Sequence, residues 1–278
     1  AQARHTALFG QTDGMLGLSR FLLMLALFPC LAGAADERNI TIATDATFPP
    51  FHYVDDAGIV TGFDVELARA ALQRAGYEAP QVVVTAYDEL FDGLLSDRHH
   101  VVAATTGITP ERQAHYLFSE PYFETCQAVL VRRAPGEPEQ LTDLAGRKVG
   151  AAGAMTSAMA LERLSGTVPV ILTKQDVTED MIRDDGRVPL LESGTIDALV
   201  VDEFEAVEAA RASQGRLRVL SQPLAREQYA FVLAPGDVAL KQALDEGLQE
   251  LRKDGTLRRI ELTYGVERGS NWPIDLER

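Results

Sequence analysis

Apolar residues in this chain gather in short runs that alternate with stretches of helical periodicity. Runs typical of buried strands lie at residues 39–44, 82–85, 101–104, 127–132, 168–172 and 198–201. Helical patterns lie between them at residues 64–74, 87–95, 157–164, 178–183 and 205–213, with Asp64 as the expected N-cap of the first. Strands that alternate with helices predict an α/β protein with mostly parallel sheets flanked by helices, because each helix carries the chain back across the sheet.

The last part of the chain predicts a helix with one apolar face. Leu240, Leu244, Leu248 and Leu251 follow one another at steps of four and three residues, and Gly255 ends the pattern. We interpret this leucine stripe as core packing. A connecting strand is expected earlier, at residues 229–233, and the polar loop at residues 133–140 is typical of a linker between domains.

The N-terminal region carries the pattern of a secretory signal peptide. The apolar run from Phe21 to Ala34 follows Arg20, is too short for a comfortable membrane span, and ends in the small residues Ala-Gly-Ala of a cleavage site. We therefore expect residues 1–34 to be an N-terminal extension with a cleaved signal peptide, and the mature protein to be periplasmic. An uncleaved anchor is the alternative.

Composition narrows the function classes. The chain has 278 residues, 46% of them hydrophobic, which is enough for one large domain or two moderate ones. Its formal net charge is −15, and −16 once Arg4, Arg20 and Asp13 leave with the signal peptide. Such an acidic protein is a poor partner for nucleic acid or for anionic lipid. Cys126 is the only cysteine after cleavage, so we expect no internal disulfide and no thiolate metal site. We also expect no cofactor, because the sequence has no phosphate loop or dinucleotide fingerprint.

An arginine in the first turn of a short helix is the most informative local feature. In the segment G-I-T-P-E-R, Thr109 can cap the turn, Pro110 suits the first helical position and Arg112 follows. A cation is unfavourable beside the positive end of a helix unless an anion joins it. A guanidinium and free backbone N–H groups together suit a carboxylate or a phosphate. The alternative is a surface ion pair with Glu111 or another acid.

Two other segments place acidic side chains at strand ends. Asp45 and the aromatic Phe48 follow the first strand, and Asp202 follows the fully apolar strand 198–201. In open α/β sheets, ligands bind at the carboxyl ends of the strands, so these side chains are candidates for one site. Each has a structural alternative, which is core packing for Phe48 and a helix N-cap for Asp202.

In order and spacing, these segments resemble the periplasmic amino-acid-binding proteins of ABC importers, which are solute-binding protein family 3 with the type II periplasmic binding fold. The resemblance covers about residues 39–265. It rests on A-T-D-A-T-F-P-P-F with G-F-D-V-E-L-A, on G-I-T-P-E-R with F-S-E-P-Y, and on D-A-L-V-V-D at residues 197–202.

The resemblance implies two lobes joined by two hinge crossings that close around a ligand. Lobe 1 would comprise residues 35–130 and 225–278, and lobe 2 residues 131–224. The expected partners are a small amino-acid-like ligand and an ABC transporter permease, and we expect a monomer.

The family's ligand-binding residues carry over by position. Arg112 would bind the α-carboxylate with help from backbone N–H groups near Gly107 and Thr156, and Asp202 the α-ammonium. Asp45 would face the ligand's side chain between walls formed by Phe48 and Tyr87. The chain departs from the family at Gly107, where a Ser or Thr hydroxyl is usual and where Thr105 or Thr106 could substitute only if the loop shifts. It also departs at Ala154-Met155-Thr156. Both changes remove polar contacts, so the ligand could also be an amino-acid derivative, a modified amine or a plain carboxylate.

The periplasmic cyclohexadienyl dehydratases, from the same superfamily, provide an enzymatic alternative. They place a glutamate three residues after the strand-end aspartate, and Glu205 stands three residues after Asp202 here. A desolvated carboxylic acid could protonate a departing hydroxyl of prephenate or arogenate. Acidic residues are also favoured at helix starts for electrostatic reasons alone. We prefer that interpretation and predict a binding protein without catalytic residues.

Overall fold

The computed structural model of this chain describes residues 39–153, 155–173 and 187–266. The predicted signal peptide and the predicted helix at residues 178–183 lie outside the described residues. The chain from residue 37 onward forms one compact unit. Within the described part, no helix combines the length and the apolar character that a membrane span requires.

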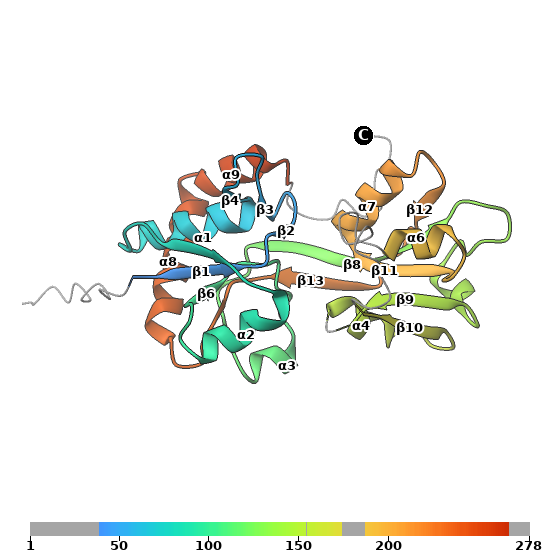
Figure 1. Cartoon of the computed structure of the whole chain (residues 1–278), viewed down its shortest axis with the longest axis horizontal. Coiled ribbons are helices and arrows are strands. Elements are labelled where there is room, and N and C mark those ends of the chain that lie inside the picture. Colours follow the sequence, from blue (N-terminus) through green and yellow to red (C-terminus); the bar gives the residue numbers. More distant parts are fainter. Residues whose placement is uncertain (1–38, 154, 174–186, 267–278) are drawn as a thin grey trace, which may run out of the picture. The chain divides into compact units, whose positions relative to one another are not determined.

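The first sheet has five strands in the order β5, β1, β6, β14, β7. Figure 1 labels β1 and β6 of this sheet. These are β5 (Gln81–Val84), β1 (Thr41–Thr44), β6 (Val101–Val102), β14 (Val232–Leu233) and β7 (Leu117–Phe118). The first three pair in parallel, whereas β14 runs antiparallel to both of its neighbours. A separate small antiparallel sheet contains β2 (Thr47–Phe48), β3 (His52–Val54) and β4 (Val60–Thr61).

Helices cover both faces of the first sheet because its strands are apolar on both sides. One core contains Ile42 with buried residues of α1 (Phe63–Arg74), α8 (Val238–Lys253) and α9 (Thr256–Tyr264). The opposite core contains Ala43 with Leu90 and Leu94 of α2 (Tyr87–Leu95). The predicted leucine stripe on α8 lies in the first of these cores, which confirms its interpretation as core packing.

The close approach of α8 to α1 depends on Gly247. A Cβ atom added there would lie 2.1 Å from the backbone oxygen of Ala71 on α1. The two helices therefore pack at a distance that no residue with a side chain permits.

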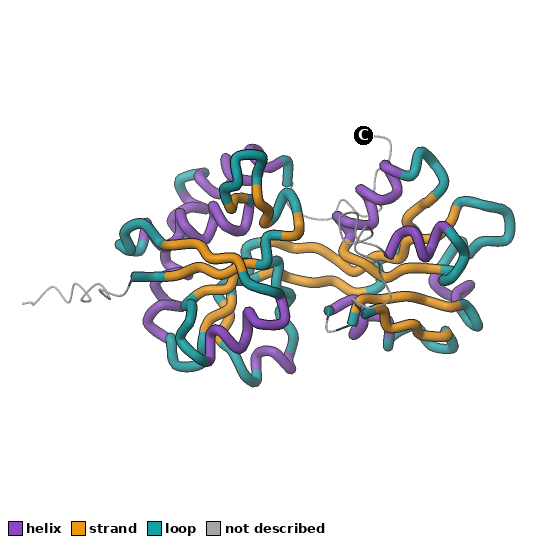
Figure 2. Tube along the Cα trace, viewed as in Figure 1, coloured by secondary structure: helices purple, strands orange, loops and turns teal. Residues whose placement is uncertain are grey.

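The second sheet has the order β10, β9, β11, β8, β12, and β13 also pairs with β8. Its strands are β8 (Phe123–Arg132), β9 (Lys148–Ala152), β10 (Val168–Leu172), β11 (Ala198–Asp202), β12 (Leu217–Val219) and β13 (Ala225–Tyr229). Figure 2 shows these strands in orange. Successive side chains of a strand point to opposite faces of the sheet. Leu199 and Val201 join a core with α6 (Arg187–Glu192) and α7 (Glu203–Ala212), whereas Ala198 and Val200 join one with α4 (Thr156–Leu161) and η1 (Leu141–Leu144).

The chain passes between the two sheets twice, from β7 into β8 and from β13 back into β14. Two helix-flanked sheets joined in this way confirm the predicted α/β, two-lobed architecture, while the exact lobe boundaries stay a prediction. The sheets are mixed rather than mostly parallel. In each sheet only three neighbouring strands pair in parallel, and one strand, β14 or β8, runs antiparallel to the strands beside it. Both of these strands are reached from the preceding strand without an intervening helix.

Local predictions differ at element ends. Helix α1 begins at Phe63 after Gly62, and Asp64 is not its cap but a fully buried side chain in its first turn. The Oδ2 atom of Asp64 instead accepts a 2.6 Å hydrogen bond from the backbone N–H of Thr105. Strand β8 begins four residues before the predicted start, and α7 begins at Glu203 rather than at Glu205.

Candidate ligand-binding site

Arg112 sits in the short helix α3 (Pro110–Gln113) in the predicted way. Thr109 caps the helix by accepting a 3.2 Å hydrogen bond from the backbone N–H of Arg112, and Pro110 occupies the first turn. The guanidinium is positioned by its own lobe, since Nη1 donates to the carbonyl oxygen of Gly107 at 3.0 Å and Nη2 donates to the hydroxyl of Tyr87 at 3.1 Å. Its central carbon lies 5.6 Å from the ring centroid of Phe91, a cation–π distance.

No acidic side chain among the described residues forms an ion pair with Arg112, so the predicted alternative, a bond to Glu111, is absent there. The hydrogen bonds to Gly107 and Tyr87 use one hydrogen of Nη1 and one of Nη2, which leaves further N–H donors on the five-donor guanidinium. A partly buried cation that is held by neutral groups is suited to bind an anion from outside the chain.

Asp202 ends β11 and directly precedes α7, but its side chain does not cap that helix. Its Oδ1 atom accepts hydrogen bonds from Nε2 of Gln127 at 2.8 Å and from the hydroxyl of Tyr229 at 2.6 Å. The capping interpretation is therefore wrong for the side chain. The strand end directs the carboxylate toward the crossing strands β8 and β13, which carry Gln127 and Tyr229.

Glu227 on β13 joins this group, although no pattern in the sequence selects it. Its Oε2 atom accepts hydrogen bonds from Oγ1 of Thr156 at 3.1 Å and from Nε2 of Gln127 at 3.2 Å. Gln127 thus donates to both Asp202 and Glu227 and brings the two carboxylates together. The pKa of Glu227 is raised to about 7, first by burial and then by the negative charge of Asp202.

Thr156, at the start of α4, is a member of the same group. Its hydroxyl accepts a 3.3 Å bond from Gln127 while donating to Glu227. Electrostatics link this group to the first lobe. The pKa of the Tyr87 hydroxyl is raised by burial, lowered by the Arg112 cation, and raised by the carboxylates of Asp45 and Asp202. Hydrogen bonds or charge interactions therefore link six of the predicted ligand residues, which are Asp45, Tyr87, Gly107, Arg112, Thr156 and Asp202.

Asp45 and Phe48 belong to a second, more aromatic part of the candidate site. Oδ1 of Asp45 lies 3.0 Å from Nδ1 of His52, and Oδ2 accepts from the hydroxyl of Thr47 at 2.7 Å. Burial raises the pKa of Asp45, but His52 and Thr47 outweigh it, and the net shift is downward. Phe48 stacks on Phe51 with ring centroids 5.4 Å apart and meets Phe204 edge-on at 6.3 Å. Phe48 therefore has core partners as well as a position beside Asp45.

The three predicted loop residues, Thr105, Thr106 and Gly107, make different contacts. The hydroxyl of Thr105 lies 3.3 Å from Nε2 of His52, and that of Thr106 is buried and donates to the carbonyl of Ala104. Gly107 accepts the bond from Arg112 through its carbonyl and forms a β-bridge with Tyr229. A Cβ atom at Gly107 would lie 3.1 Å from Cγ2 of Thr156 and 3.5 Å from Oε2 of Glu227.

Glu205, the proposed acid of the enzymatic alternative, forms an ion pair with Arg187. Nη2 of Arg187 lies 3.0 Å from Oε1 and 3.2 Å from Oε2 of Glu205. An adjacent guanidinium stabilises the carboxylate form, whereas a proton donor must hold its proton until the leaving group departs. This contact argues against the dehydratase mechanism.

Cys126 is fully buried, and its thiol donates to Glu203 at 3.5 Å. Burial raises the pKa of this thiol, which supports a packing role.

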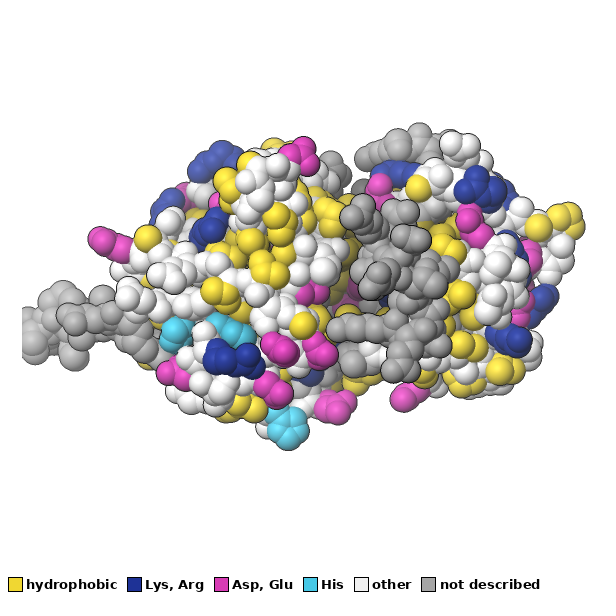
Figure 3. Space-filling view, in the orientation of Figure 1, with side chains coloured by type: hydrophobic (Ala, Val, Ile, Leu, Met, Phe, Trp, Pro, Cys, Tyr) yellow, Lys and Arg dark blue, Asp and Glu magenta, His cyan; other side chains and the backbone are white. Residues whose placement is uncertain are grey.

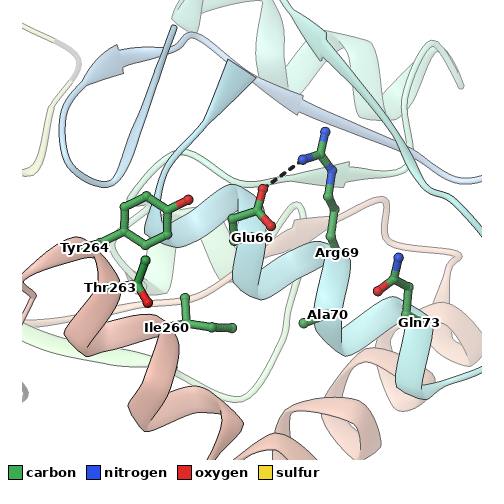
Figure 4. A pocket seen from close by; sticks show the side chains of 7 residues that line it. All are labelled: Glu66, Arg69, Ala70, Gln73, Ile260, Thr263 and Tyr264. Carbon is green, nitrogen blue, oxygen red and sulfur yellow. Dashed lines mark hydrogen bonds and ion pairs between the residues drawn. The ribbon is translucent and has the colours of Figure 1, made fainter. Parts of the chain in front are cut away.

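A pocket of about 310 Å³ lies elsewhere, between α1 and α9 (Figure 4). Its lining residues are Glu66, Arg69, Ala70, Gln73, Ile260, Thr263 and Tyr264. Glu66 and Arg69 form an ion pair across one turn of α1 at 2.8 Å. None of the predicted ligand residues lines this pocket, so it is not the candidate site.

Residues 40–267 match the bacterial extracellular solute-binding proteins, family 3. The chain belongs to this family. The L-cystine-binding protein TcyJ of Escherichia coli K12 is 30% identical over 234 residues, which are 84% of this chain and 85% of TcyJ. Membership confirms the family predicted from the three motif segments.

Two solved structures show the same fold. The arginine-, lysine-, histidine-binding protein ArtJ from Geobacillus stearothermophilus matches with a TM-score of 0.70 and 29% identity, over 84% of this chain and 97% of ArtJ. The ancestral amino acid-binding protein AncCDT-1, a precursor of cyclohexadienyl dehydratase, matches with a TM-score of 0.67 and 27% identity, over 81% of this chain and 94% of AncCDT-1. This chain thus resembles amino-acid-binding proteins, one of which is a precursor of an enzyme.

Proposed function

We propose that this protein is a periplasmic solute-binding protein that captures a small amino-acid-like carboxylate by closing its two lobes around it and delivers it to an ABC importer. The observation that carries the proposal is the state of Arg112. Its guanidinium is fixed by Gly107 and Tyr87 and has no acidic partner among the described residues. An α-carboxylate would supply the missing anion through a bidentate contact.

The second half of the ligand is matched by Asp202. Its carboxylate is turned away from the helix cap and toward the crossing strands, where it would accept hydrogen bonds from an α-ammonium. Arg112 belongs to the first lobe and Asp202 to the second. A zwitterion that binds both would stabilise the arrangement in which the lobes close, because it gains both contacts only there.

The similar proteins support this proposal by what they bind. The names of TcyJ and ArtJ describe binding of L-cystine and of arginine, lysine and histidine, respectively. We extend the amino-acid class, but none of these individual ligands, to this chain. We also propose that the protein binds its ligand without transforming it, and that it works as a monomer in the periplasm together with a permease.

The test is a thermal-shift screen of the mature protein against amino acids, their derivatives and small organic acids, followed by calorimetric titration of each hit. A ligand present at 100 times its Kd stabilises the native state by about 2.7 kcal/mol, which gives a clear rise in Tm. Arg112→Ala is expected to weaken binding by about 100-fold, because a buried charged contact is worth on the order of 2–5 kcal/mol.

Arg98→Ala provides the matched control. Arg98 is exposed beside α2, and its Nη1 atom lies 3.7 Å from Oε2 of Glu89. Its removal therefore deletes a guanidinium of the same lobe that lies outside the site. Wild-type affinity in this variant, with loss in Arg112→Ala, supports the carboxylate clamp. A hit that binds Arg112→Ala as tightly as the wild type overturns it.

A further inference from the structure

Glu227 borders the space above Gly107. A Cβ atom built on Gly107 would lie 3.1 Å from Cγ2 of Thr156 and 3.5 Å from Oε2 of Glu227. The carbonyl oxygen of the same glycine accepts a 3.0 Å hydrogen bond from the guanidinium of Arg112. The Glu227 carboxyl group therefore stands beside the loop of the carboxylate clamp, at the position where the family usually has a Ser or Thr hydroxyl.

Gln127 brings the carboxyl groups of Glu227 and Asp202 close together. Its Nε2 atom lies 2.8 Å from Oδ1 of Asp202 and 3.2 Å from Oε2 of Glu227, and the whole side chain is buried. Oε1 of Glu227 accepts no hydrogen bond from any described residue, and the Glu227 side chain is only partly buried. Two acids that share one neutral donor are within reach of a single small cation, which the amide itself does not provide.

Among the described residues, the ionisable side chains that act on Glu227 come from four elements. They are Asp202 of β11, Arg112 of α3, Cys126 of β8 and Tyr229 of β13. Arg112 is the one cation in this set, and its effect on the pKa of Glu227 ranks after that of Asp202. The negative charge of the pair is therefore not balanced from within this set, and the pair favours a positive group beside Asp202.

We propose that Glu227 is a further ligand-binding residue, which accepts a hydrogen bond from the ligand's α-ammonium together with Asp202 and replaces the hydroxyl that Gly107 lacks. This inference rests on the proposed function, because it assumes that an amino-acid-like ligand occupies the site. An ammonium group has three N–H donors and can bond to both acids at once. The pair then selects a free α-ammonium over N-acylated amino acids and plain carboxylates, which the sequence leaves open as ligands.

Binding of the ammonium should expel a proton from Glu227. Burial and the charge of Asp202 raise the pKa of Glu227 to about 7 without ligand, so the group is mostly protonated at pH 6.5. A cation beside the carboxyl group lowers its pKa again, so binding releases the proton to the buffer and becomes tighter as pH rises. If Glu227 instead donated its proton to the ligand's carboxylate, binding would take up a proton. The direction of proton exchange therefore separates these two roles.

Calorimetric titration in two buffers measures this proton. The mature protein is screened against the protein-forming L-amino acids and L-cystine, and the tightest binder is titrated at pH 6.5 in Pipes and in Bis-Tris, which have different ionisation enthalpies. We expect the wild type to release about half a proton or more per bound amino acid. Its affinity should rise about tenfold from pH 5 to pH 8, because a tenfold effect corresponds to a pKa change of one unit.

Glu227→Gln keeps the shape of the side chain but removes the proton that can be exchanged. This variant should bind the same amino acid about tenfold more weakly than the wild type at pH 8, the effect of one charge-assisted hydrogen bond. At pH 5 the two affinities should agree within about threefold, and proton release should be absent. A residue with only a structural role would weaken binding equally at both pH values.

Glu124→Gln is the matched control, since Glu124 is an exposed acid on β8 that bonds to Gln228 rather than to the site. It should keep the wild-type affinity and proton release. Amino-acid binding by the wild type without proton exchange, or with proton uptake, overturns the role of Glu227 and leaves the proposed function intact. Binding of plain carboxylates but of no amino acid does the same. If no amino acid, derivative or organic acid binds the wild type, both proposals fail together.

Discussion

Glu227 makes the stability of the ligand-free protein depend on pH, and the dependence can be isolated with the substitution Glu227→Gln. Burial raises the pKa of this carboxyl group from its ordinary value of 4.5 to about 7 in the folded protein. Between these two pH values, the folded protein therefore keeps the proton of Glu227, whereas the unfolded chain has released it. This contribution to stability is fully present below about pH 4.5 and is lost as pH rises through about 7.

The size of the effect follows from the pKa difference. One pKa unit corresponds to about 1.4 kcal/mol, so the full loss for Glu227 is about 3 kcal/mol. Most of it falls between pH 5 and pH 8. A glutamine keeps the shape and an oxygen acceptor for Thr156 and Gln127, but it has no proton to lose in this range.

Urea unfolding of both proteins at pH 5 and at pH 8 measures this quantity. The difference in unfolding free energy between Glu227→Gln and the wild type should shift by about 2–3 kcal/mol in favour of the variant at the higher pH. Asp64 is buried with a pKa raised to about 6, and it adds a dependence of the same sign to both proteins, which cancels in the comparison. A difference that is the same at both pH values refutes the reasoning, because Glu227 would then titrate alike in the folded and unfolded states.

Two further predictions concern packing and chemistry. Gly247→Ala should lower the unfolding free energy by about 1–3 kcal/mol or more, because its Cβ would meet the backbone of α1 and no side-chain movement can relieve the contact. Gly236→Ala, where no atom lies within 4 Å of the added Cβ, should be neutral, and equal melting temperatures for the two variants would contradict the argument. The mature protein should not consume prephenate, because Glu205 is paired with Arg187. Prephenate turnover by the wild type that Glu205→Gln abolishes, followed by ultraviolet absorbance, would establish the enzyme instead.

Features with a local sequence signal could be predicted. Thr109 and Pro110 cap and start α3 as their residue types demand, and Asp202 follows an unbroken apolar strand. The leucine repeat of α8 also specifies its buried face. In these segments, neighbouring residues alone decide the structure.

Glu227 could not be selected in this way. It stands in the segment A-R-E-Q-Y, where charged residues among apolar ones suggest an exposed edge strand. Only the pairing of β13 with β8 shows that Ala225, Glu227 and Tyr229 lie on the same face of the sheet. On that face, the Glu227 side chain is directed toward Gln127. The departure from the family at Gly107 was interpreted as a loss of polar contacts and did not point to Glu227.

The pairing of Arg187 with Glu205 was missed for a related reason. The two residues are 18 positions apart and come from different helices, and sequence spacing carries no information about such a contact. The pattern of three acids at the start of α7 suggested a dipole effect, but the structure adds a specific cation. Long-range ion pairs of this kind affect whether a carboxyl group can serve as a proton donor, and the spacing of residues along the sequence does not predict them.

On the face drawn in Figure 3, acidic and basic side chains are interspersed over the surface. The net negative charge is therefore spread rather than gathered in one block there. The charged side chains of the candidate site, such as Asp202 on β11 and Glu227 on β13, are partly buried instead.

Strands β8 and β13 carry Gln127 and Glu227, and they are also the strands at which the chain leaves one sheet for the other. The hydrogen-bond group around Asp202 and the connections between the two sheets are thus carried by the same two strands. An evolving lineage could not exchange Glu227 for a neutral residue without also altering a hydrogen-bonded joint. Engineers who wish to change the cargo of this protein, or to build a sensor from it, should expect every change of selectivity at these positions to alter the opening equilibrium as well.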